Sequence, residues 1–200
     1  MVYPIFRWIL LLLVKLFVKD VKGTENIPKK GPFIVAANHY SYLDPFLIGC
    51  YIVKKTNQKI HYIALRGGRF EFFGDFIIRR WAGSISIQYN RQGIAAGLEE
   101  ANICLKKRGI VGIFPIGPGY SPDKPGTGVA RLALTAKCPV LPVTLKGTKE
   151  TMPIPSLVPR KFRHITLNYK KLLIFTSTNK VKRITKIVQE AILPGVNGKK

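Results

Sequence analysis

The chain has 200 residues, enough to bury one sizeable core, so a single domain is the default expectation. Its 33 basic residues against 10 acidic residues give a formal net charge of +23, which implies anionic partners such as nucleic acid or an anionic membrane. The cysteines and histidines show neither a Cys-x-x-Cys pair nor clustered metal-ligand spacing, so we expect no disulfide framework and no metal site.

Residues 1–20 are mostly apolar and predict a membrane-associating helix. The uninterrupted apolar run Trp8–Val14 is too short to cross a bilayer, which needs about 20 residues. Arg7, Lys15 and Lys19 flank the run, and their long stems can reach lipid phosphates. A signal peptide is one alternative, although no small-residue cleavage site follows, and an ordinary core helix is another.

The stretch from Phe33 to Phe46 carries the most chemical information. The apolar run Phe33–Ala37 ends at Asn38-His39, and Asp44-Pro45 follows after four residues. This pattern predicts a buried strand, a turn and a helix that opens at Asp44. A histidine at a strand end with a carboxylate near it has the minimum equipment for general-base catalysis. The alternative is structural, with Asp44 as an N-cap and His39 as a satisfied histidine.

The rest of the chain alternates strand and helix patterns, which is typical of an α/β protein. The expected helices are Pro45–Lys54, a segment through Ile94 and Leu105 with a glycine stop at Gly109, Val129–Lys137, and Lys180–Leu193. The expected strands are Ile60–Leu65, Gly83–Tyr89, Ile110–Phe114, Val140–Leu145 with Pro142 at an edge or bulge, and Ile165–Phe175. Residues 66–74 form an aromatic, glycine-bearing loop that either covers the core or contributes to an acyl-chain tunnel or membrane face.

Several short sequence motifs resemble those of the glycerolipid acyltransferases, and they occur in the same order along roughly residues 20 to 150. Asn38-His-Tyr-Ser-Tyr-Leu-Asp44 is similar to the His-four-residues-Asp motif of that superfamily. The similarity is strongest to its 1-acylglycerol-3-phosphate (lysophosphatidate) acyltransferase branch. Later blocks are similar at Gly83–Ile87, Ile110–Pro115, Gly128–Arg131 and Cys138–Val143.

The resemblance implies a fold and a domain organisation. We expect a single-domain αβ sandwich whose mixed, mostly parallel central sheet is flanked by helices. Residues 1–20 would be the membrane-interfacial helix and residues 21–200 the acyltransferase domain. The protein would lie on the cytoplasmic face of a membrane, either peripheral or monotopic.

The resemblance also implies a reaction, the transfer of a fatty acyl group from a thioester to the hydroxyl of a lysophosphatidate-like acceptor in phospholipid biosynthesis. His39 would take the hydroxyl proton, and Asp44 would fix the imidazole tautomer and stabilise the imidazolium. The attacking group belongs to the acceptor, so no serine or cysteine nucleophile is called for. The substrate-binding candidates are Asn38, Arg91, Pro115, Gly117, Gly119, Lys124 and Arg131.

Three of these candidates rest on positive charge. The family usually has an arginine where this chain has Tyr89, and Arg91 is the nearest arginine that could grip a phosphate bidentately. Lys124 and Arg131 are placed to contact phosphate or a carrier. For all three the alternative is an ordinary solvated position in a very basic chain.

The third block departs from the family pattern Phe-Pro-Glu-Gly-Thr-Arg-Ser. This chain has Ile116 at the glutamate position and Gly119 at the arginine position. The departure leaves open an altered acceptor or a non-catalytic lipid-binding relative.

The expected partners follow from the same reasoning. They are anionic membrane lipids, a lysophospholipid acceptor and an acyl thioester donor, either acyl-CoA or an acyl carrier protein thioester, and no resident cofactor is expected. Nucleic-acid binding is the least favoured reading, because the basic residues are spread along the chain and not clustered with stacking aromatics.

Overall fold

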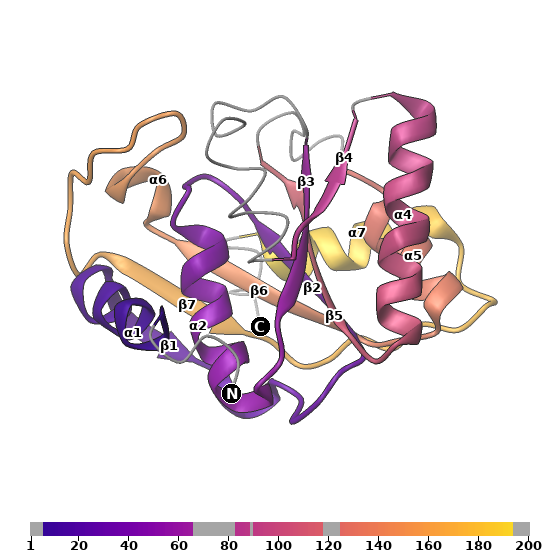
Figure 1. Ribbon diagram of the computed structural model, residues 1–200, viewed down its shortest axis with the longest axis horizontal. Helices are drawn as coiled ribbons and strands as arrows, with labels where there is room; N and C mark the ends of the chain where they lie inside the picture. The colour runs from indigo at the N-terminus through magenta and orange to yellow at the C-terminus, as the bar shows by residue number, and fades with distance from the viewer. Residues whose placement is uncertain (1–5, 66–82, 89, 118–124, 194–200) are drawn as a thin grey trace.

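The computed structural model describes residues 6–65, 83–88, 90–117 and 125–193, which form one seven-stranded sheet with helices on both faces (Figure 1). The strands are β1 (Val18–Lys22), β2 (Phe33–Asn38), β3 (Ile60–Leu65), β4 (Ile85–Ile87), β5 (Ile110–Ile116), β6 (Val140–Lys146) and β7 (Ile165–Tyr169). The helices are α1 (Phe6–Phe17), α2 (Asp44–Thr56), α4 (Arg91–Lys106), α5 (Gly128–Ala136), α6 (Thr148–Thr151) and α7 (Val181–Ile192), with a short 3₁₀ helix η1 (Thr24–Asn26).

The sheet order is β1-β7-β6-β2-β5-β3-β4. Each neighbouring pair of these strands is parallel except β6 and β7, which run antiparallel. The prediction of a mixed, mostly parallel sheet is therefore confirmed. The parallel strands β2, β5 and β3 end at the same edge of the sheet, which is where open α/β sheets carry their chemistry.

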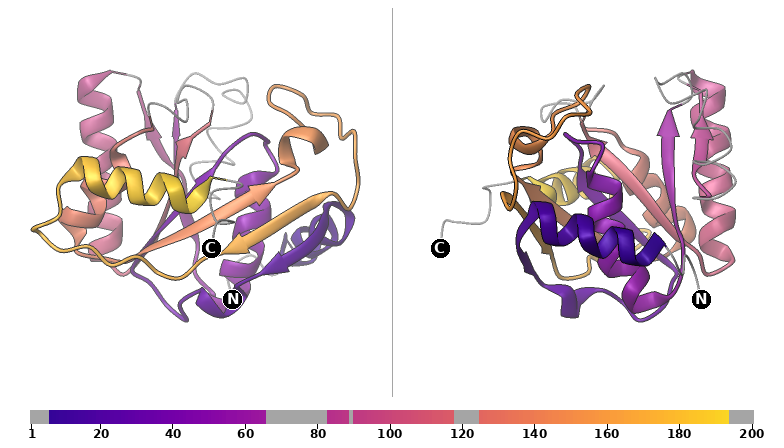
Figure 2. Two further views of the ribbon diagram at one scale, coloured as in Figure 1. Left: turned by 180° about the vertical axis from the view of Figure 1, so that it is seen from behind. Right: turned by 60° about the vertical axis from the view of Figure 1, so that its left-hand side comes forward.

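Helices cover both faces of the sheet, so the central strands are buried on both sides. Side chains alternate along β2: Phe33 and Val35 pack toward α1 and α2, whereas Ile34 and Ala36 pack toward α4, α5 and α7. Figure 2 shows α7 lying across the face opposite α2. This double burial explains why the strand reads as a continuous apolar run and does not alternate with polar residues.

Pro142 lies in β6, an interior strand, and so it is not at the sheet edge. It lies opposite a bulge, which is in the segment that follows β7 and not in β6 itself. Val140 pairs with Leu173 and Val143 pairs with Tyr169, so one extra residue is present on the β7 side between these pairs. The missing proline N–H is tolerated where the ladder is interrupted in this way.

Several predicted element ends differ from the structure. The strand expected over Gly83–Tyr89 is present only as Ile85–Ile87, and Tyr89 lies outside the described residues. The final strand stops at Tyr169, well before Phe175, because the segment beyond it meets β6 only at the isolated Leu173 bridge. The helix before β5 ends at Lys106, and the left-handed residue beyond it is Arg108 (φ 62°), not the predicted glycine. Gly109 instead donates its N–H to the Cys104 carbonyl.

The N-terminal helix is present as α1 and packs partly into the core. Val14 and Phe17 are buried in the cluster beneath α1 and α2, so the inner face behaves as a core helix. Leu12 and Leu16 stay exposed on the outer face. Within the described residues, no helix has both the length and the apolar character needed to cross a membrane.

Candidate active site

His39 follows the last residue of β2, at the carboxyl edge of the sheet. Its backbone N–H donates to the Ile116 carbonyl at 2.9 Å, which fastens the strand end to β5. The chain then turns through residues 40–43 and enters α2 at Asp44. The helix opens as predicted, with Pro45 in its first turn, where a missing N–H costs nothing.

The turn brings His39 and Asp44 together. The distance from His39 Nδ1 to Asp44 Oδ2 is 3.0 Å. The carboxyl side chain is fully buried, and the imidazole is 21% exposed. Because a carboxylate can only accept, Nδ1 donates and Nε2 keeps the lone pair of a general base.

Asp44 is itself held by the backbone of the turn. Its Oδ2 accepts the N–H groups of Tyr40 at 2.7 Å and Ser41 at 2.8 Å. Ser41 adds a further restraint, since its hydroxyl oxygen accepts the Leu43 N–H. The carboxylate therefore organises the loop and orients the imidazole at the same time. The predicted N-cap role is wrong, because the N-cap of α2 is Leu43 and the Asp44 side chain bonds the preceding turn. The catalytic role of Asp44 stays a prediction.

Two aromatic rings stack behind the histidine. The Phe114 ring lies 4.3 Å from the His39 ring, centroid to centroid, at 24° between planes. Tyr62 in turn stacks on Phe114 at 5.5 Å and 7°. The imidazole is therefore fixed by a ring at its face and a carboxylate at its Nδ1 edge.

Two tyrosine hydroxyls tie α2 to the sheet beneath this site. Tyr62 donates to the Pro45 carbonyl and Tyr169 donates to the Ile48 carbonyl, each at 2.9 Å. Burial raises the pKa of Tyr62 well above its usual range, and the Asp44 carboxylate raises it further. Burial likewise raises the pKa of Tyr169. Both phenols remain protonated donors and hold the first turns of the helix that carries Asp44.

A bulge in β5 brings Phe114 and Gly117 to the histidine. Ala36 pairs with Ile113 while Asn38 pairs with Ile116, so β5 has one residue more than β2 between these pairs. Gly117 then lies directly against His39: a Cβ added to it would be 2.7 Å from the His39 carbonyl oxygen and 2.9 Å from its Cβ. This approach leaves room only for glycine, and the substrate-binding role of Gly117 stays a prediction.

Pro115 lies within the bulge and is buried. Its carbonyl accepts the Gly126 N–H at 3.0 Å, which ties β5 to the segment leading into α5. Ile116, at the position where the family pattern has glutamate, is fully buried in the cluster under α4, α5 and α7. At this position the chain has a core residue and no carboxyl group.

Asn38 has a different role from the one predicted. It is fully buried, its Nδ2 donates to the Leu145 carbonyl, and its Oδ1 accepts the Leu145 N–H, both at 2.9 Å. Because both polar atoms of the amide are bonded to β6, the predicted contact of this side chain with substrate is wrong. Asn38 is a positioning residue that extends the β2–β6 ladder to the residue before His39.

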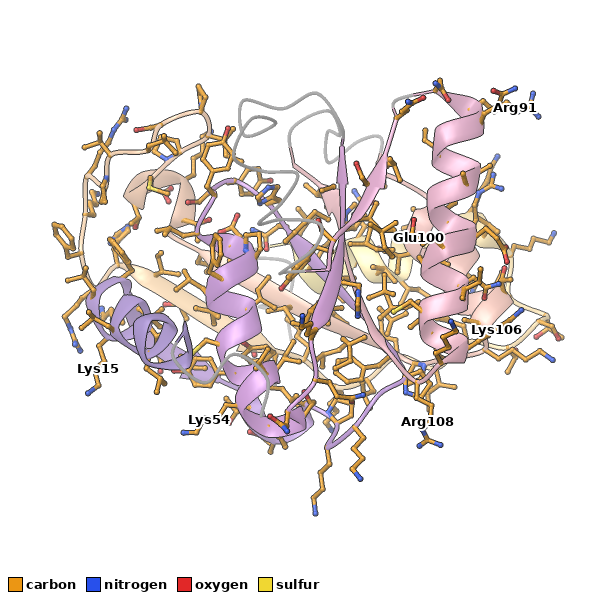
Figure 3. The ribbon with its side chains drawn as sticks, viewed as in Figure 1. Lys15, Lys54, Arg91, Glu100, Lys106 and Arg108 are labelled. Carbon is orange, nitrogen blue, oxygen red and sulfur yellow. The ribbon has the colours of Figure 1, made fainter. Side chains whose placement is uncertain are left out.

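The basic candidates lie apart from this cluster. Arg91 begins α4, and Figure 3 shows its side chain pointing outward from the top of that helix. Arg131 is exposed on α5, on the sheet face opposite α2, and its Nε donates to the Thr127 hydroxyl at 3.3 Å. Gly119, Lys124 and the loop 66–74 lie outside the described residues. The structure thus brings His39, Asp44 and Gly117 together and leaves Arg91 and Arg131 separate.

Phe114, Tyr62 and Tyr169 were missed by sequence reasoning. Phe114 lies in an apolar strand pattern, and the tyrosines lie in strands whose neighbours cannot be read from one sequence. Phe114 could have been found from its position just before Pro115, because a proline within a strand indicates a bulge. In the described part of the chain, no group of three or more His, Cys, Asp or Glu side chains could hold a metal ion.

Comparison with known proteins agrees with this geometry. A family model described as Acyltransferase matches residues 19–146, from the second residue of β1 to the end of β6. The chain belongs to the acyltransferase family. The match contains the whole of the His39–Asp44 turn and the β5 bulge.

Two relatives of this acyltransferase-family chain carry the same name. It is 30% identical over 134 residues to a 1-acyl-sn-glycerol-3-phosphate acyltransferase of Bacillus subtilis, covering 64% of this chain and 62% of the relative. It is 29% identical over 154 residues to one of Saccharomyces cerevisiae, covering 72% of this chain and 47% of the relative. The matches therefore span less than two thirds of each relative's length.

A solved structure shares the fold. The 1-acyl-sn-glycerophosphate acyltransferase PlsC from Thermotoga maritima superposes with a TM-score of 0.64 at 26% identity. The superposition covers 92% of this chain and 72% of that structure. The predicted α/β single-domain architecture is thus confirmed by both the sheet topology and the comparison.

Proposed function

We propose that this protein transfers a fatty acyl group from an acyl thioester to the free hydroxyl of a lysophosphatidate-like glycerophospholipid. The observation that carries the proposal is the bond between His39 Nδ1 and the buried Asp44 carboxylate, which makes Nε2 a base at the edge of the sheet. Membership of the acyltransferase family and the names of the relatives support it.

The step balances without a cofactor or a protein nucleophile. His39 Nε2 takes the proton of the acceptor hydroxyl as its oxygen attacks the thioester carbonyl carbon. The tetrahedral intermediate collapses with cleavage of the C–S bond, and the thiolate leaves and takes the proton back from the imidazolium. Asp44 stabilises that imidazolium. The backbone of Gly117, which lies against His39, is our candidate for stabilising the oxyanion.

The proposal includes a membrane setting. The exposed Leu12 and Leu16 of α1, with the exposed Lys15 beside them, support a helix that lies in the interface of an anionic membrane. The cytoplasmic face is part of the proposal. The acyl donor would be an acyl-CoA or an acyl carrier protein thioester. Arg91, Lys124 and Arg131 stay predictions for contacts with the acceptor phosphate or the carrier.

The test follows thiol release and phosphatidate formation by the purified protein in anionic vesicles that contain lysophosphatidate. Replacing the base in His39→Ala should lower kcat by roughly 100- to 10,000-fold, the usual contribution of a general base. The matched control is His164→Ala, because His164 is exposed and lies far from the turn in sequence. Full turnover in His39→Ala would remove His39 from the mechanism.

Asp44→Asn separates orientation from loop structure. His39 Nδ1 and the Tyr40 and Ser41 N–H groups all bond to Asp44 Oδ2, so an asparagine Oδ1 at that position can still accept them, but the neutral amide lacks the negative charge that stabilises an imidazolium. We expect a small change in the free energy of unfolding and a loss of kcat comparable to that of His39→Ala. Loss of folding in place of activity would assign Asp44 a structural role alone.

The buried Ile116 favours one rival, a lipid-binding relative that does not turn over. Binding of lysophosphatidate or acyl-CoA without thiol release, across a panel of lysophospholipid acceptors, would support that rival. Turnover with a different acceptor would support acyl transfer with an altered acceptor site.

A further inference from the structure

The segment from Pro153 to Arg163 connects α6 to β7 and carries a group of exposed apolar side chains. Leu157, Val158 and Phe162 are 56%, 70% and 58% exposed. Most large apolar side chains of the described chain are buried. Three exposed ones within six residues therefore indicate a surface that another molecule covers.

This loop also concentrates positive charge. Arg160, Lys161 and Arg163 are exposed, and the loop contains no acidic residue. Among the described residues, no salt bridge pairs any of the three. Apolar side chains beside unpaired cations are typical of surfaces that insert between anionic lipid headgroups.

Hydrogen bonds fix the loop between the candidate active site and α1. At its start, the Ile154 N–H donates to the Tyr40 carbonyl at 3.0 Å, next to His39. At its end, the Arg163 N–H donates to the Leu16 carbonyl at 3.0 Å, and Phe162 stacks on Phe17 at 5.5 Å. Figure 1 shows the loop beyond α6 descending toward α1.

The tip of the loop is ordered in advance. The Ser156 hydroxyl bonds to both the N–H and the carbonyl of Val158, each at 3.2 Å, and Pro153, Pro155 and Pro159 restrict the backbone around it. A tip that is already ordered loses little conformational entropy when it inserts.

We propose that the loop Pro153–Arg163 is a second membrane-docking element, which inserts Leu157 and Val158 into an anionic bilayer beside the exposed face of α1. The occupant is the bilayer because the apolar tip is bordered by unpaired cations and the end of the loop is bonded to α1 at Leu16, whose side chain is exposed. This inference rests on the proposed function, because the proposed acceptor is a lipid that lies in that bilayer. Docking through the loop brings the His39 turn close to the lipid surface, since Tyr40 is bonded to the loop.

Insertion is measured directly with an environment-sensitive fluorophore. The label is attached to Val158→Cys in a Cys104→Ser background, because the other two cysteines are buried. Ile174→Cys is the matched control, since Ile174 is 80% exposed in a segment away from the loop. With vesicles of phosphatidylglycerol and phosphatidylcholine, we expect a blue shift and a rise in emission at position 158 and no change at position 174.

Affinity is measured with the pair Leu157→Ser and Val158→Ser, which leaves the Phe162–Phe17 stack intact. We expect vesicle binding to weaken by roughly tenfold or more, whereas Ile103→Ser with Ile174→Ser should bind like the unchanged protein. Replacing Arg160, Lys161 and Arg163 with glutamine should weaken binding by about fivefold per residue, and only to vesicles that contain anionic lipid.

Enzyme assays separate this inference from the proposed function. With a short-chain acyl-CoA and a short-chain lysophosphatidate below its micelle concentration, the Leu157→Ser, Val158→Ser protein should keep its turnover, and it should lose turnover on vesicles. Absence of turnover in the unchanged protein would count against the proposed function while the label still reports insertion. A label at position 158 that stays in water on vesicle-bound protein would overturn the docking loop.

Discussion

At the scale of single residues, Asn38 makes its main contribution through two buried hydrogen bonds to Leu145. Asn38→Ala would leave the Leu145 N–H and carbonyl without these partners in a fully buried setting. We expect a loss of about 2 to 4 kcal/mol in the free energy of unfolding, since each orphaned group costs about 1 to 3 kcal/mol. Urea denaturation measures this loss.

The control for that experiment is Asn102→Ala. Asn102 is also buried, but its Oδ1 has no hydrogen-bond partner among the described residues. The substitution should therefore cost clearly less. Equal losses in the two variants would show that the bonds between Asn38 and Leu145 add nothing beyond side-chain packing.

Gly117 gives a second prediction at this scale. Gly117→Ala would place a Cβ 2.7 Å from the His39 carbonyl oxygen, so the histidine or its strand must move. A displacement of about 1 Å at a reacting group can cost roughly 100-fold in rate, and we expect kcat to fall by at least about tenfold. Steady-state kinetics on folded protein measures this.

Gly128→Ala is the control for Gly117→Ala. A Cβ at Gly128 would be 3.6 Å from Leu98 Cδ2, an ordinary contact at the start of α5. That variant should keep its kcat. If Gly117→Ala also kept its kcat, the close approach of Gly117 to His39 would be irrelevant to the reaction.

The sequence predicted that His39 and Asp44 lie close together but not the surroundings of the pair. His39 and Asp44 were found because they are each other's partner and are only five residues apart, so local spacing alone brings them together. Asn38 was misassigned because its partner, Leu145, is 107 residues away. The Phe114 stack was missed for the same reason, since it depends on a bulge between two strands.

At the scale of elements, the contact between α4 and β4 depends on Gly97. A Cβ at Gly97 would clash with Ile87 Cγ2, which lies 1.9 Å from the ideal position. Gly97→Ala should therefore destabilise the protein, although alanine favours a helix by about 1 kcal/mol over glycine. Thermal unfolding with circular dichroism measures the change.

The control compares Gly97→Ser with Ala95→Ser, the same side chain introduced at two positions of α4. Ala95 is exposed on the same helix, so serine there meets no neighbouring strand. We expect the melting temperature to fall for the Gly97 variants and to change little for Ala95→Ser. A higher melting temperature for Gly97→Ala would mean that α4 shifts away from β4 at little cost.

Element types were predicted better than element ends. Helices α2, α4, α5 and α7 and strands β3, β5 and β6 lie where the apolar periodicities placed them. The strand expected over Ile165–Phe175 stops at Tyr169 because the bulge opposite Pro142 breaks the ladder, and a single sequence does not reveal that pairing.

At the scale of the whole molecule, burial raises the pKa values of several thiol and phenol groups. Burial raises the pKa of Cys138 from 9.0 to about 11 and raises the pKa values of Tyr62 and Tyr169 above 10.0. The folded protein keeps these protons at a pH where the unfolded chain releases them. Their stabilising contribution is complete below pH 9.0 and is lost as the pH rises through 9.0 to 11 for Cys138 and above 10.0 for the tyrosines.

We therefore expect the free energy of unfolding to fall steadily above about pH 9. Lys170 acts in the opposite direction, because burial, then Lys146, lowers its pKa from 10.5. Burial also raises the pKa values of Tyr40, Tyr51 and Cys104, which add to the expected fall. Urea denaturation at a series of alkaline pH values measures the slope. In Cys138→Ala the slope near pH 9 to 10 should be flatter, and an unchanged slope would exclude Cys138 as a source.

The pairing of β1 with β7 has a consequence for synthesis of the chain. Val21 pairs with Leu167, so the first strand waits for the last one before it has a neighbour in the sheet. At roughly 5 to 20 residues per second, a ribosome needs on the order of 10 to 30 seconds to make the intervening segment. Throughout that interval β1, which follows α1 directly, has no strand beside it in the sheet. A nascent chain of this topology therefore presents its apolar leading helix to a nearby bilayer, or to a chaperone, well before the sheet can close.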